Sequence, residues 1–351
     1  MMQIKPAKKK ITAAITVTIL LIVVTAVIFF VSAPLHEPDE HYGYAMGSEI
    51  AAVFYGGDNE KIADTLFSAI NTLDTQLISA KSDKSEIYIL NKNGNYELSD
   101  ETLFYIKKSL ELCKDSDGAL DITIGRLSSL WGFDTSDNII PDSSVIEEEK
   151  SFCGYEKLTI NGNTVTLGEN QKLDMGALGK GIACDMTKDI LSENGTKRAL
   201  ISVGGTILTY SDGNDYYWHD GWGIAVRTPE TDDSSPLLRV HITDTRVFST
   251  SGDYEKYFEK DGILYHHILD PKTGYPADTG LKSVTVVADN GLVADGLSTA
   301  CFVLGKEKSR SLLEKYNAEA IFVDKNNNVY ITDGIFDDCT LMNDSYTVKK
   351  I

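Results

Sequence analysis

The segment Leu173–Asp185 reads LDMGALGKGIACD and combines residue types that suit a phosphate ester. A short apolar run leads to Asp174, three glycines form a turn around Lys180, and a helical pattern begins at Ile182. Glycines let a backbone approach a ligand closely, and the first amides of a helix attract anions. No Ser or Thr follows the lysine, and the order G-x-G-x-x-G is absent, so neither standard phosphate-binding fingerprint fits. By itself the pattern is equally consistent with a plain strand–turn–helix junction.

A second group of oxygens lies in the stretch Ser283–Gly305, which predicts a strand, a short turn and a helix. Asp295, Ser298 and Thr299 are spaced i, i+3 and i+4, so a helix places all three on one face. Hard cations such as magnesium bind such oxygens together with waters and substrate phosphates. The alternative is a helix start that is capped by these side chains and exposed to solvent.

The stretch Ser249–Ala277 holds further side chains that could react. These are Ser251, Asp253, His266, His267 and Asp270. The nucleophile elbow G-x-S-x-G is missing, which disfavours a serine hydrolase triad. Adjacent strand residues point to opposite faces, so the two histidines are a poor zinc pair. The run Asp270–Gly274 is typical of a turn.

The elements that must position these groups form an irregular series of strands and helices. Apolar residues repeat at helical spacing over 62–77, and Ser99 is a good N-cap for a second helix. Lys157–Leu167 predicts a β-hairpin, and Ala199–Leu208 a strand with a Gly-Gly pair in mid-run, where a flat ligand could approach. Further strands are expected at 46–55, 222–227, 238–242 and 247–249. Strands outnumber helices, which favours an α+β fold with antiparallel or mixed sheets packed by helices.

Composition and charge exclude some functions and suggest a location. The 351 residues have a net charge of -19, which repels nucleic-acid backbones. Ile11–Val31 has 21 uncharged residues, enough for a helix of ~31 Å across a bilayer core. Lysines precede this run, so we expect them on the cytoplasmic side and the rest of the chain outside. A signal peptide cleaved near Ala33 is the alternative.

The predicted organisation therefore has three parts. Residues 1–32 form a basic stub and one transmembrane anchor, residues 33–45 a polar linker, and residues 46–345 one catalytic domain. The five cysteines are dispersed, without C-x-x-C or metal-ligand spacing, and are expected as buried thiols or at most one disulfide.

Seven motifs in series resemble the ApbE family, the FAD:protein FMN transferases. They are the entrance Met46-Gly47-Ser48, GALDITIGRLSSLWGF, LDMGALGKGIACD, ISVGG, STSGDY, HHILDPKTGYP and ADGLSTA. The resemblance runs from about Met46 to about Gly305. It implies an ApbE or T-fold-like α+β unit of two closely associated subdomains, with FAD in the cleft between them.

The resemblance also implies roles for individual residues. FAD contacts are implied for Met46, Ala119, Leu120, Asp121, Asp174, Lys180, Ile268 and Leu269. A magnesium ion is implied on Asp295, Ser298, Thr299 and the backbone oxygen of Ala177. The general base is expected to be His267, because an imidazole titrates near neutral pH, with Asp253 nearly as good.

The implied reaction is magnesium-dependent transfer of FMN from FAD to a Thr or Ser hydroxyl of a partner flavoprotein, with release of AMP. The partner is expected to be an exported or membrane protein, and the enzyme a single-pass membrane protein with its catalytic domain outside. Two alternatives remain open. One is a magnesium-dependent FAD pyrophosphatase, in which water replaces the hydroxyl, and the other is a flavin-binding protein without chemistry.

Overall fold

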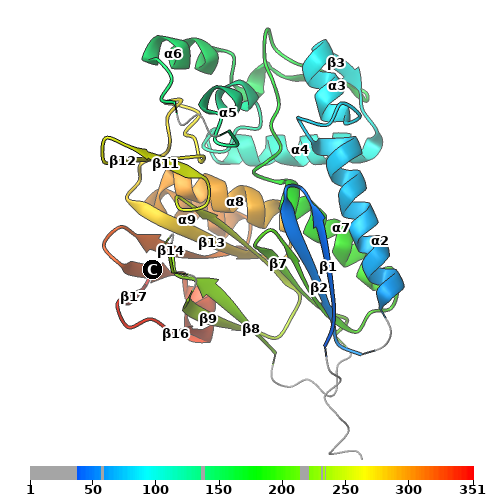
Figure 1. Cartoon of the computed structure of the whole chain (residues 1–351), viewed down its shortest axis with the longest axis vertical. Coiled ribbons are helices and arrows are strands. Elements are labelled where there is room, and N and C mark those ends of the chain that lie inside the picture. The colour runs from blue at the N-terminus through cyan, green and yellow to red at the C-terminus, as the bar shows by residue number, and fades with distance from the viewer. Residues whose placement is uncertain (1–37, 57–58, 136–138, 214–220, 231, 234) are drawn as a thin grey trace, which may run out of the picture. The chain divides into compact units, whose positions relative to one another are not determined.

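A nine-stranded sheet forms the centre of the protein (Figure 1). This computed structural model describes residues 38–351 except 57–58, 136–138, 214–220, 231 and 234. The described part forms one unit from Asp39 to Ile351. The predicted anchor within residues 1–32 lies outside the described residues. Within them, no helix is both long and apolar enough to cross a bilayer.

The strand order of the central sheet is β1-β2-β6-β7-β10-β13-β14-β15-β17. Neighbours are antiparallel except for β15 and β17, which are parallel, so the sheet is mixed. Its strands are β1 (Asp39–Ala45), β2 (Ser48–Phe54), β6 (Arg198–Val203), β7 (Thr206–Ser211), β10 (Arg246–Gly252), β13 (Leu281–Ala288), β14 (Glu319–Asp324), β15 (Asn328–Ile331) and β17 (Thr347–Lys350). Three small antiparallel sheets contain β3 (Asn95–Glu97), β4 (Thr159–Asn161) and β5 (Thr164–Thr166), then β8 (Trp222–Arg227), β9 (Pro236–Ile242) and β16 (Cys339–Leu341), and finally β11 (Tyr257–Lys260) with β12 (Ile263–His266).

Helices cover one face of the central sheet, and the β8-β9-β16 sheet covers part of the other. On β13, Val284 and Val286 pack into the core formed with the helices, whereas Val287 packs into the core under β8 and β9. The helices are α2 (Glu60–Thr72), α3 (Glu86–Asn93), α4 (Asp100–Asp115), α5 (Gly125–Trp131), α6 (Ser143–Ser151), α7 (Gly179–Glu193), α8 (Gly291–Leu304) and α9 (Lys306–Lys315), with the π-helix η1 (Leu73–Ile78) and the 3-10 helices η2 (Tyr155–Lys157) and η3 (Asp333–Asp338). This arrangement confirms the predicted α+β class.

Helices α7 and α8 cross closely at a pair of glycines. A Cβ built on Gly181 would lie 2.0 Å from the carbonyl oxygen of Gly291, and one built on Gly291 would lie 2.2 Å from the oxygen of Gly181. No side chain fits at either position, so the two backbones touch there. The crossing brings the start of α7 against the first turns of α8.

Two expectations from the sequence are wrong. Asp39–Ala45, expected within the linker 33–45, is strand β1, and residues 33–37 lie outside the described residues. Glu40, Tyr42 and Tyr44 alternate along β1 and are exposed, and β1 is an edge strand, where polar residues are common. Gly204 and Gly205 do not interrupt one strand but form the turn between β6 and β7, with φ of 53° and 94°. Both values favour glycine.

Other predicted elements are confirmed. The apolar repeat over 62–77 forms α2 and η1, and Ser99 caps α4, where its Oγ accepts a 3.2 Å hydrogen bond from the N–H of Thr102. Lys157–Leu167 contains the hairpin of β4 and β5. The motif Gly118–Phe133 contains α5, and its Trp131 donates a 2.9 Å hydrogen bond to the oxygen of Gly274.

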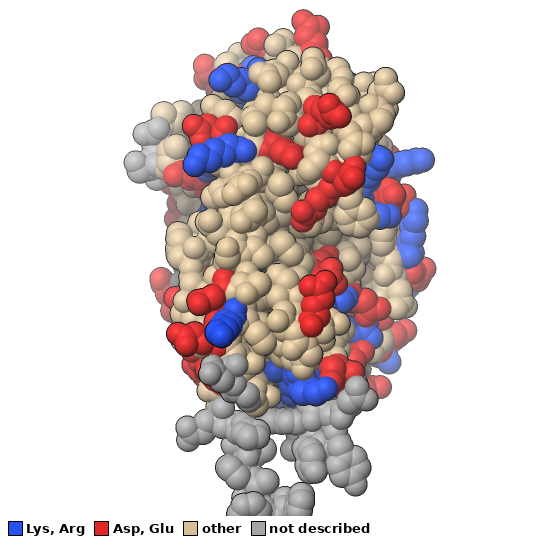
Figure 2. All heavy atoms as spheres, turned by 90° about the vertical axis from the view of Figure 1, so that its right-hand side faces the viewer, with Lys and Arg blue, Asp and Glu red and all other residues tan. Residues whose placement is uncertain are grey.

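Charged side chains of both signs share the surface. On the face in Figure 2, carboxylates are spread among smaller groups of lysines and arginines. The acidic excess of the chain is thus not gathered into one block on that face.

Candidate active site

The candidate site is built around Asp295, a buried carboxylate on α8. Its Oδ1 accepts a 2.6 Å hydrogen bond from Ser249 Oγ on β10, and its Oδ2 accepts a 2.8 Å bond from the N–H of Gly181 on α7. Burial raises the pKa of Asp295, and the charge of Lys180 and the hydrogen bonds oppose that rise. Three elements that are far apart in the sequence therefore meet at one carboxylate.

Three hydroxyl groups continue the site along β10 and α8. Ser251 Oγ lies 2.8 Å from Ser298 Oγ and 3.2 Å from Thr299 Oγ1, and Ser298 Oγ donates a 2.8 Å bond to the backbone oxygen of Asp295. Asp295, Ser298 and Thr299 thus share one face of α8, as their spacing predicts, and that face lies against β10.

The carbonyl oxygen of Ala177 has an unusual position just before α7. Its regular helical donor would be the N–H of Gly181, which donates to Asp295 instead. Within the described part of the chain, no hydrogen bond reaches the oxygen of Ala177. This oxygen is therefore available to a ligand, in agreement with its implied role.

These donors suit a hard cation that also binds phosphate. Among the described residues, no cluster of three or more His, Cys, Asp or Glu side chains could hold a metal ion. The site offers instead one carboxylate, hydroxyl groups and a carbonyl oxygen. Magnesium commonly takes one or two carboxylates and completes its shell with waters and substrate phosphates. The residues present fit such an ion only together with an anionic substrate.

Lys180 lies at the start of α7, half-buried beside the turn between β6 and β7. Its Cδ lies 3.4 Å from where a Cβ on Gly204 would be. Met46, from the turn between β1 and β2, places its Cε 3.0 Å from a Cβ built on Gly179, so it also borders the start of α7. The backbone N–H of Met46 donates to Asp74 Oδ2 (3.1 Å). Two of the predicted FAD contacts are thus brought together at one helix start.

The carboxylate of Asp174 is bound within its own loop, and that of Asp121 joins its loop to the start of η2. Asp174 Oδ1 accepts from the N–H of Gly176 (2.8 Å), which shapes the turn before α7. Asp121 accepts from the N–H and Oγ1 of Thr123 (2.8 and 2.7 Å) and from the N–H of Tyr155 (3.2 Å). Asp121 therefore holds its loop against η2, and its role as a direct FAD contact stays a prediction.

Four other predicted contacts have buried side chains. Ala119 and Leu120 are each 3% exposed, and Ile268 and Leu269 are 5% and 3% exposed. All four belong to the core, so a ligand could meet them chiefly through the backbone. Their implied FAD contacts remain predictions.

The two candidate bases differ in electrostatic surroundings. Burial raises the pKa of Asp253 to about 6, although Lys325 and Lys282 oppose the rise. Burial, followed by the charges of Lys256 and the neighbouring His266 and Lys180, lowers the pKa of His267 to about 4. Asp253 follows β10 and continues the alternation of Ser249 and Ser251 toward this end of the sheet.

His267 is held by its backbone, and its ring is enclosed. Its N–H donates to the oxygen of Lys256 (3.0 Å), and its Nδ1 is buried without a hydrogen-bond partner among the described residues. The neighbouring His266 is structural, since its Nε2 lies 3.0 Å from the oxygen of Ala277 and its Nδ1 accepts from Ile268 (3.3 Å). An unpartnered buried ring nitrogen is unusual and is consistent with a nitrogen that meets a substrate.

Sequence reasoning missed the roles of Ser249 and Gly181 at Asp295, and of Ser251 beside Thr299. The alternation of Ser249, Ser251 and Asp253 was visible in the strand. What was not visible was that this strand lies against α8.

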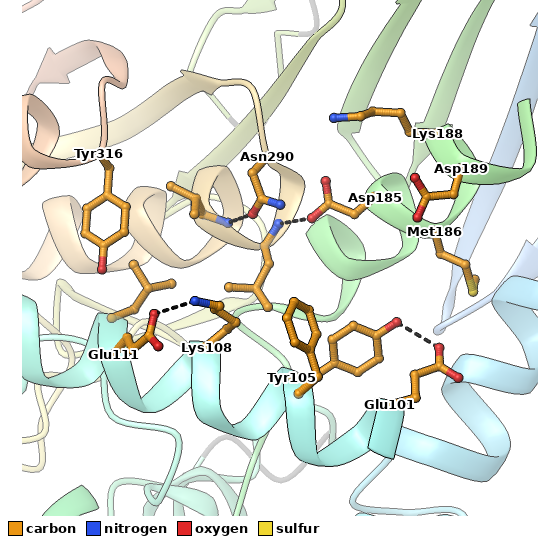
Figure 3. A pocket seen from close by; sticks show the side chains of 14 residues that line it. Glu101, Tyr105, Lys108, Glu111, Asp185, Met186, Lys188, Asp189, Asn290 and Tyr316 are labelled. Atoms are coloured by element: carbon orange, nitrogen blue, oxygen red, sulfur yellow. Dashed lines mark hydrogen bonds and ion pairs between the residues drawn. The ribbon is translucent and has the colours of Figure 1, made fainter. Parts of the chain in front are cut away.

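A pocket of ≈ 510 Å³ lies elsewhere, between α4, α7 and the start of α8 (Figure 3). Asp185 accepts there from the N–H groups of Gly291 (2.7 Å) and Leu292 (2.9 Å), and so caps α8. Tyr105 donates to Glu101 (2.8 Å) on α4. None of the predicted site residues lines this pocket. Its polar groups hold helices together and are separate from the candidate site.

Known proteins share both the sequence and the fold. The FAD:protein FMN transferase of Treponema pallidum is 32% identical over 293 residues, covering 78% of this chain and 80% of the relative. That of Vibrio cholerae is 30% identical, covering 76% and 80%. Among solved structures, the ApbE protein of Thermotoga maritima is similar with a TM-score of 0.75 at 29% identity, covering 84% of this chain and 96% of that one.

A second solved structure, the flavinyl transferase ApbE of Pseudomonas stutzeri in its apo form, has a TM-score of 0.72 at 30% identity, covering 82% of this chain and 92% of that one. The sequence profile of the ApbE family matches residues 46–322, a range that includes every residue of the candidate site. The chain belongs to the ApbE family.

Proposed function

We propose that this protein transfers FMN from FAD to a hydroxyl group of a partner flavoprotein and releases AMP. The proposal rests on one structural observation: Asp295 and Thr299 of α8 lie close to Lys180 at the start of α7. The chain is also similar to FAD:protein FMN transferases. A carboxylate, oriented hydroxyls and a lysine suit a diphosphate better than an uncharged ligand.

The transfer exchanges one P–O bond for another. The hydroxyl oxygen of a Thr or Ser bonds to the phosphorus on the FMN side of FAD, the bond from that phosphorus to the bridging oxygen breaks, and AMP leaves with the bridging oxygen. The hydroxyl proton passes to a base on this protein. Such reactions depend mainly on positioning and on neutralising phosphate charge.

Lys180 would bind the diphosphate as a point charge at the start of α7, where backbone N–H groups also favour anions. Asp295, Thr299, Ser298 and the oxygen of Ala177 would hold a magnesium ion. When bound, this ion would supply further charge neutralisation at the diphosphate. Two observations support this assignment: the donors are all oxygens, and no hydrogen bond among the described residues reaches the oxygen of Ala177.

We favour Asp253 over His267 as the base. A base works best when its pKa lies near the pH of the reaction, and the pKa of Asp253 is raised to about 6 whereas that of His267 is lowered to about 4. At pH 7 Asp253 is mostly ionised and more basic than an ordinary carboxylate. His267, neutral at that pH, would contact the substrate through its enclosed Nδ1.

We also propose that Ile11–Val31 anchors the chain in the membrane with the catalytic domain outside. The uncharged run and the lysines before it support this location. The acceptor would then be an exported or membrane flavoprotein. Protease added to intact cells should degrade the domain, and protection in intact cells with digestion after lysis would contradict the proposal.

The test of function uses the purified full chain, FAD, magnesium chloride and a flavoprotein that carries FMN covalently on threonine. Covalent flavin is read by in-gel fluorescence and AMP by chromatography. Labelled acceptor together with AMP supports the transferase. AMP and free FMN without labelled acceptor would indicate a pyrophosphatase, and bound FAD without AMP would indicate a binding protein.

A further inference from the structure

We propose that Ser249 and Ser251 of β10 are positioning residues that orient the oxygens of Asp295 and Thr299 toward a cation. This inference rests on the proposed function, because it concerns the same site. It adds two residues from a different element, which contact the proposed ligands but are not themselves ligands.

The two serines share the face of β10 that lies against α8. Ser249 is 1% exposed and reaches Asp295, and Ser251 is half-buried and reaches Thr299. Thr250, between them, points to the other face, where its Oγ1 lies 2.8 Å from that of Thr285. Alternation along the strand therefore separates two serines at the site from one threonine that does not reach it.

The hydrogen of Ser249 determines the first half of the arrangement. A hydroxyl has one hydrogen, and that of Ser249 goes to Asp295 Oδ1 at 2.6 Å. The 3.3 Å contact between Thr206 Oγ1 and Ser249 Oγ must then have Thr206 as its donor. Thr206 thus orients Ser249, and Ser249 orients the carboxylate. Among the described residues, Ser249 provides the one side chain that donates a hydrogen bond to Asp295.

The hydrogens of the other hydroxyls follow in the same way. Ser298 donates to the backbone oxygen of Asp295, so in its 2.8 Å contact with Ser251 it is the acceptor. Ser251 has then used its one hydrogen, and in its 3.2 Å contact with Thr299 it accepts. The hydrogen of Thr299 consequently points at Ser251.

This direction matters because a hydroxyl binds a cation through its oxygen lone pairs. With its hydrogen directed to Ser251, Thr299 Oγ1 is left with lone pairs that no hydrogen bond among the described residues uses. Without Ser251, the hydroxyl of Thr299 can rotate and present its hydrogen to the site. Removing a group that hydrogen-bonds to a metal ligand and fixes its orientation typically lowers metal affinity about 10- to 100-fold.

The experiment measures magnesium binding without requiring turnover. Magnesium chloride is titrated into the full chain with FAD and no acceptor, and flavin fluorescence anisotropy gives the magnesium concentration for half-maximal FAD binding. Ser249→Ala and Ser251→Ala should each raise this midpoint by about 10-fold or more. Thr250→Val, which removes a hydroxyl from the opposite face of the same strand, should leave it unchanged.

Two further variants separate positioning from damage to the fold. Ser251→Thr keeps the hydroxyl and should keep the midpoint near that of the unchanged protein. Thr206→Val leaves Ser249 in place but removes its donor, and should raise the midpoint less than Ser249→Ala. Circular dichroism and the melting temperature identify any variant that has lost its fold.

The inference would be overturned if neither serine-to-alanine variant changed the midpoint, or if Thr250→Val raised it as much as they do. FAD binding that does not depend on magnesium would overturn it as well. The result is independent of transfer. If the midpoints shift as expected but no acceptor is labelled, the positioning role stands and the proposed transfer fails.

Discussion

The backbone N–H of Gly181 donates a 2.8 Å hydrogen bond to Asp295 Oδ2 across the crossing of α7 and α8. The bond is possible because Gly181 and Gly291 let the two backbones touch. It links the helix start that carries Lys180 to the carboxylate proposed to bind magnesium. The close packing of α7 against α8 therefore also fixes the position of Asp295 in the site.

The first prediction concerns this crossing. In Gly181→Ala, the new Cβ would lie 2.0 Å from the oxygen of Gly291 and 2.7 Å from the Cβ of Asp295, so the helices must separate. We expect the free energy of unfolding to fall by about 3 kcal/mol or more, at the upper end of overpacking effects, as measured by urea denaturation. Gly223→Ala is the matched control, because its nearest neighbour is the flexible side chain of Arg239. Equal stability of both variants would show that the crossing is not tight.

The second prediction concerns the pH dependence of the reaction. If Asp253 is the base, it must be ionised, so the rate should rise with pH up to about 6 and level off above it. Asp253→Asn should lower the rate about 100-fold or more and remove the inflection. His267→Ala should lower the rate but leave an inflection near the same pH. An inflection that survives in Asp253→Asn and disappears in His267→Ala would assign the base to the histidine.

The third prediction concerns stability, through the same carboxyl group. The pKa of Asp253 is raised on folding from 3.8 to about 6, so the folded state binds this proton more tightly than the unfolded chain does. Its contribution to stability is present below about pH 4 and is lost as pH rises through about 6. Asp253→Asn cannot ionise and should therefore raise the melting temperature at pH 8 relative to the unchanged protein. The prediction would be contradicted if the melting temperature of Asp253→Asn, minus that of the unchanged protein, were smaller at pH 8 than at pH 4.

The fourth prediction tests whether Lys180 contacts the diphosphate of FAD or its flavin ring. Lys180→Met removes a positive charge at the start of α7 and should weaken FAD binding about 10-fold, roughly 1.4 kcal/mol. Riboflavin has no phosphate, so its binding should change little. Lys188→Met is the control, because Lys188 lies farther along α7 and donates to the backbone oxygen of Asp289 near the pocket in Figure 3. If Lys180→Met weakened riboflavin binding as much as FAD binding, Lys180 would not be a contact of the diphosphate.

Local patterns in the sequence predicted much of this site. The spacing of Asp295, Ser298 and Thr299 places them on one helix face, and the glycines around Lys180 predict a turn that opens a helix. Both inferences need only a few neighbouring residues, which is why they hold.

Longer-range relationships could not be obtained in this way. Ser249 is 46 positions from Asp295 in the chain, and nothing in either segment indicates that β10 lies against α8. The polar composition of β1 is typical of a linker as well as of an edge strand, and the two are distinguished by its pairing with β2. A Gly-Gly pair such as Gly204-Gly205 suits a close ligand contact, but between apolar runs it is also a hairpin signal, and here it forms the turn between β6 and β7. In each case the local sequence allows two structures, and contacts between segments distant in the sequence determine which one forms.

The most direct test of the account is the stoichiometry of transfer at the site of Asp295. The full chain, FAD, magnesium chloride and a threonine-bearing acceptor flavoprotein are mixed, and covalent flavin and AMP are measured over time. We predict one AMP for each labelled acceptor, and at least about a 100-fold loss of both products in Asp295→Asn, measured at FAD and magnesium concentrations that saturate the unchanged protein. Labelled acceptor at an undiminished rate in Asp295→Asn would contradict the central claim, because the buried carboxylate would then not serve the reaction.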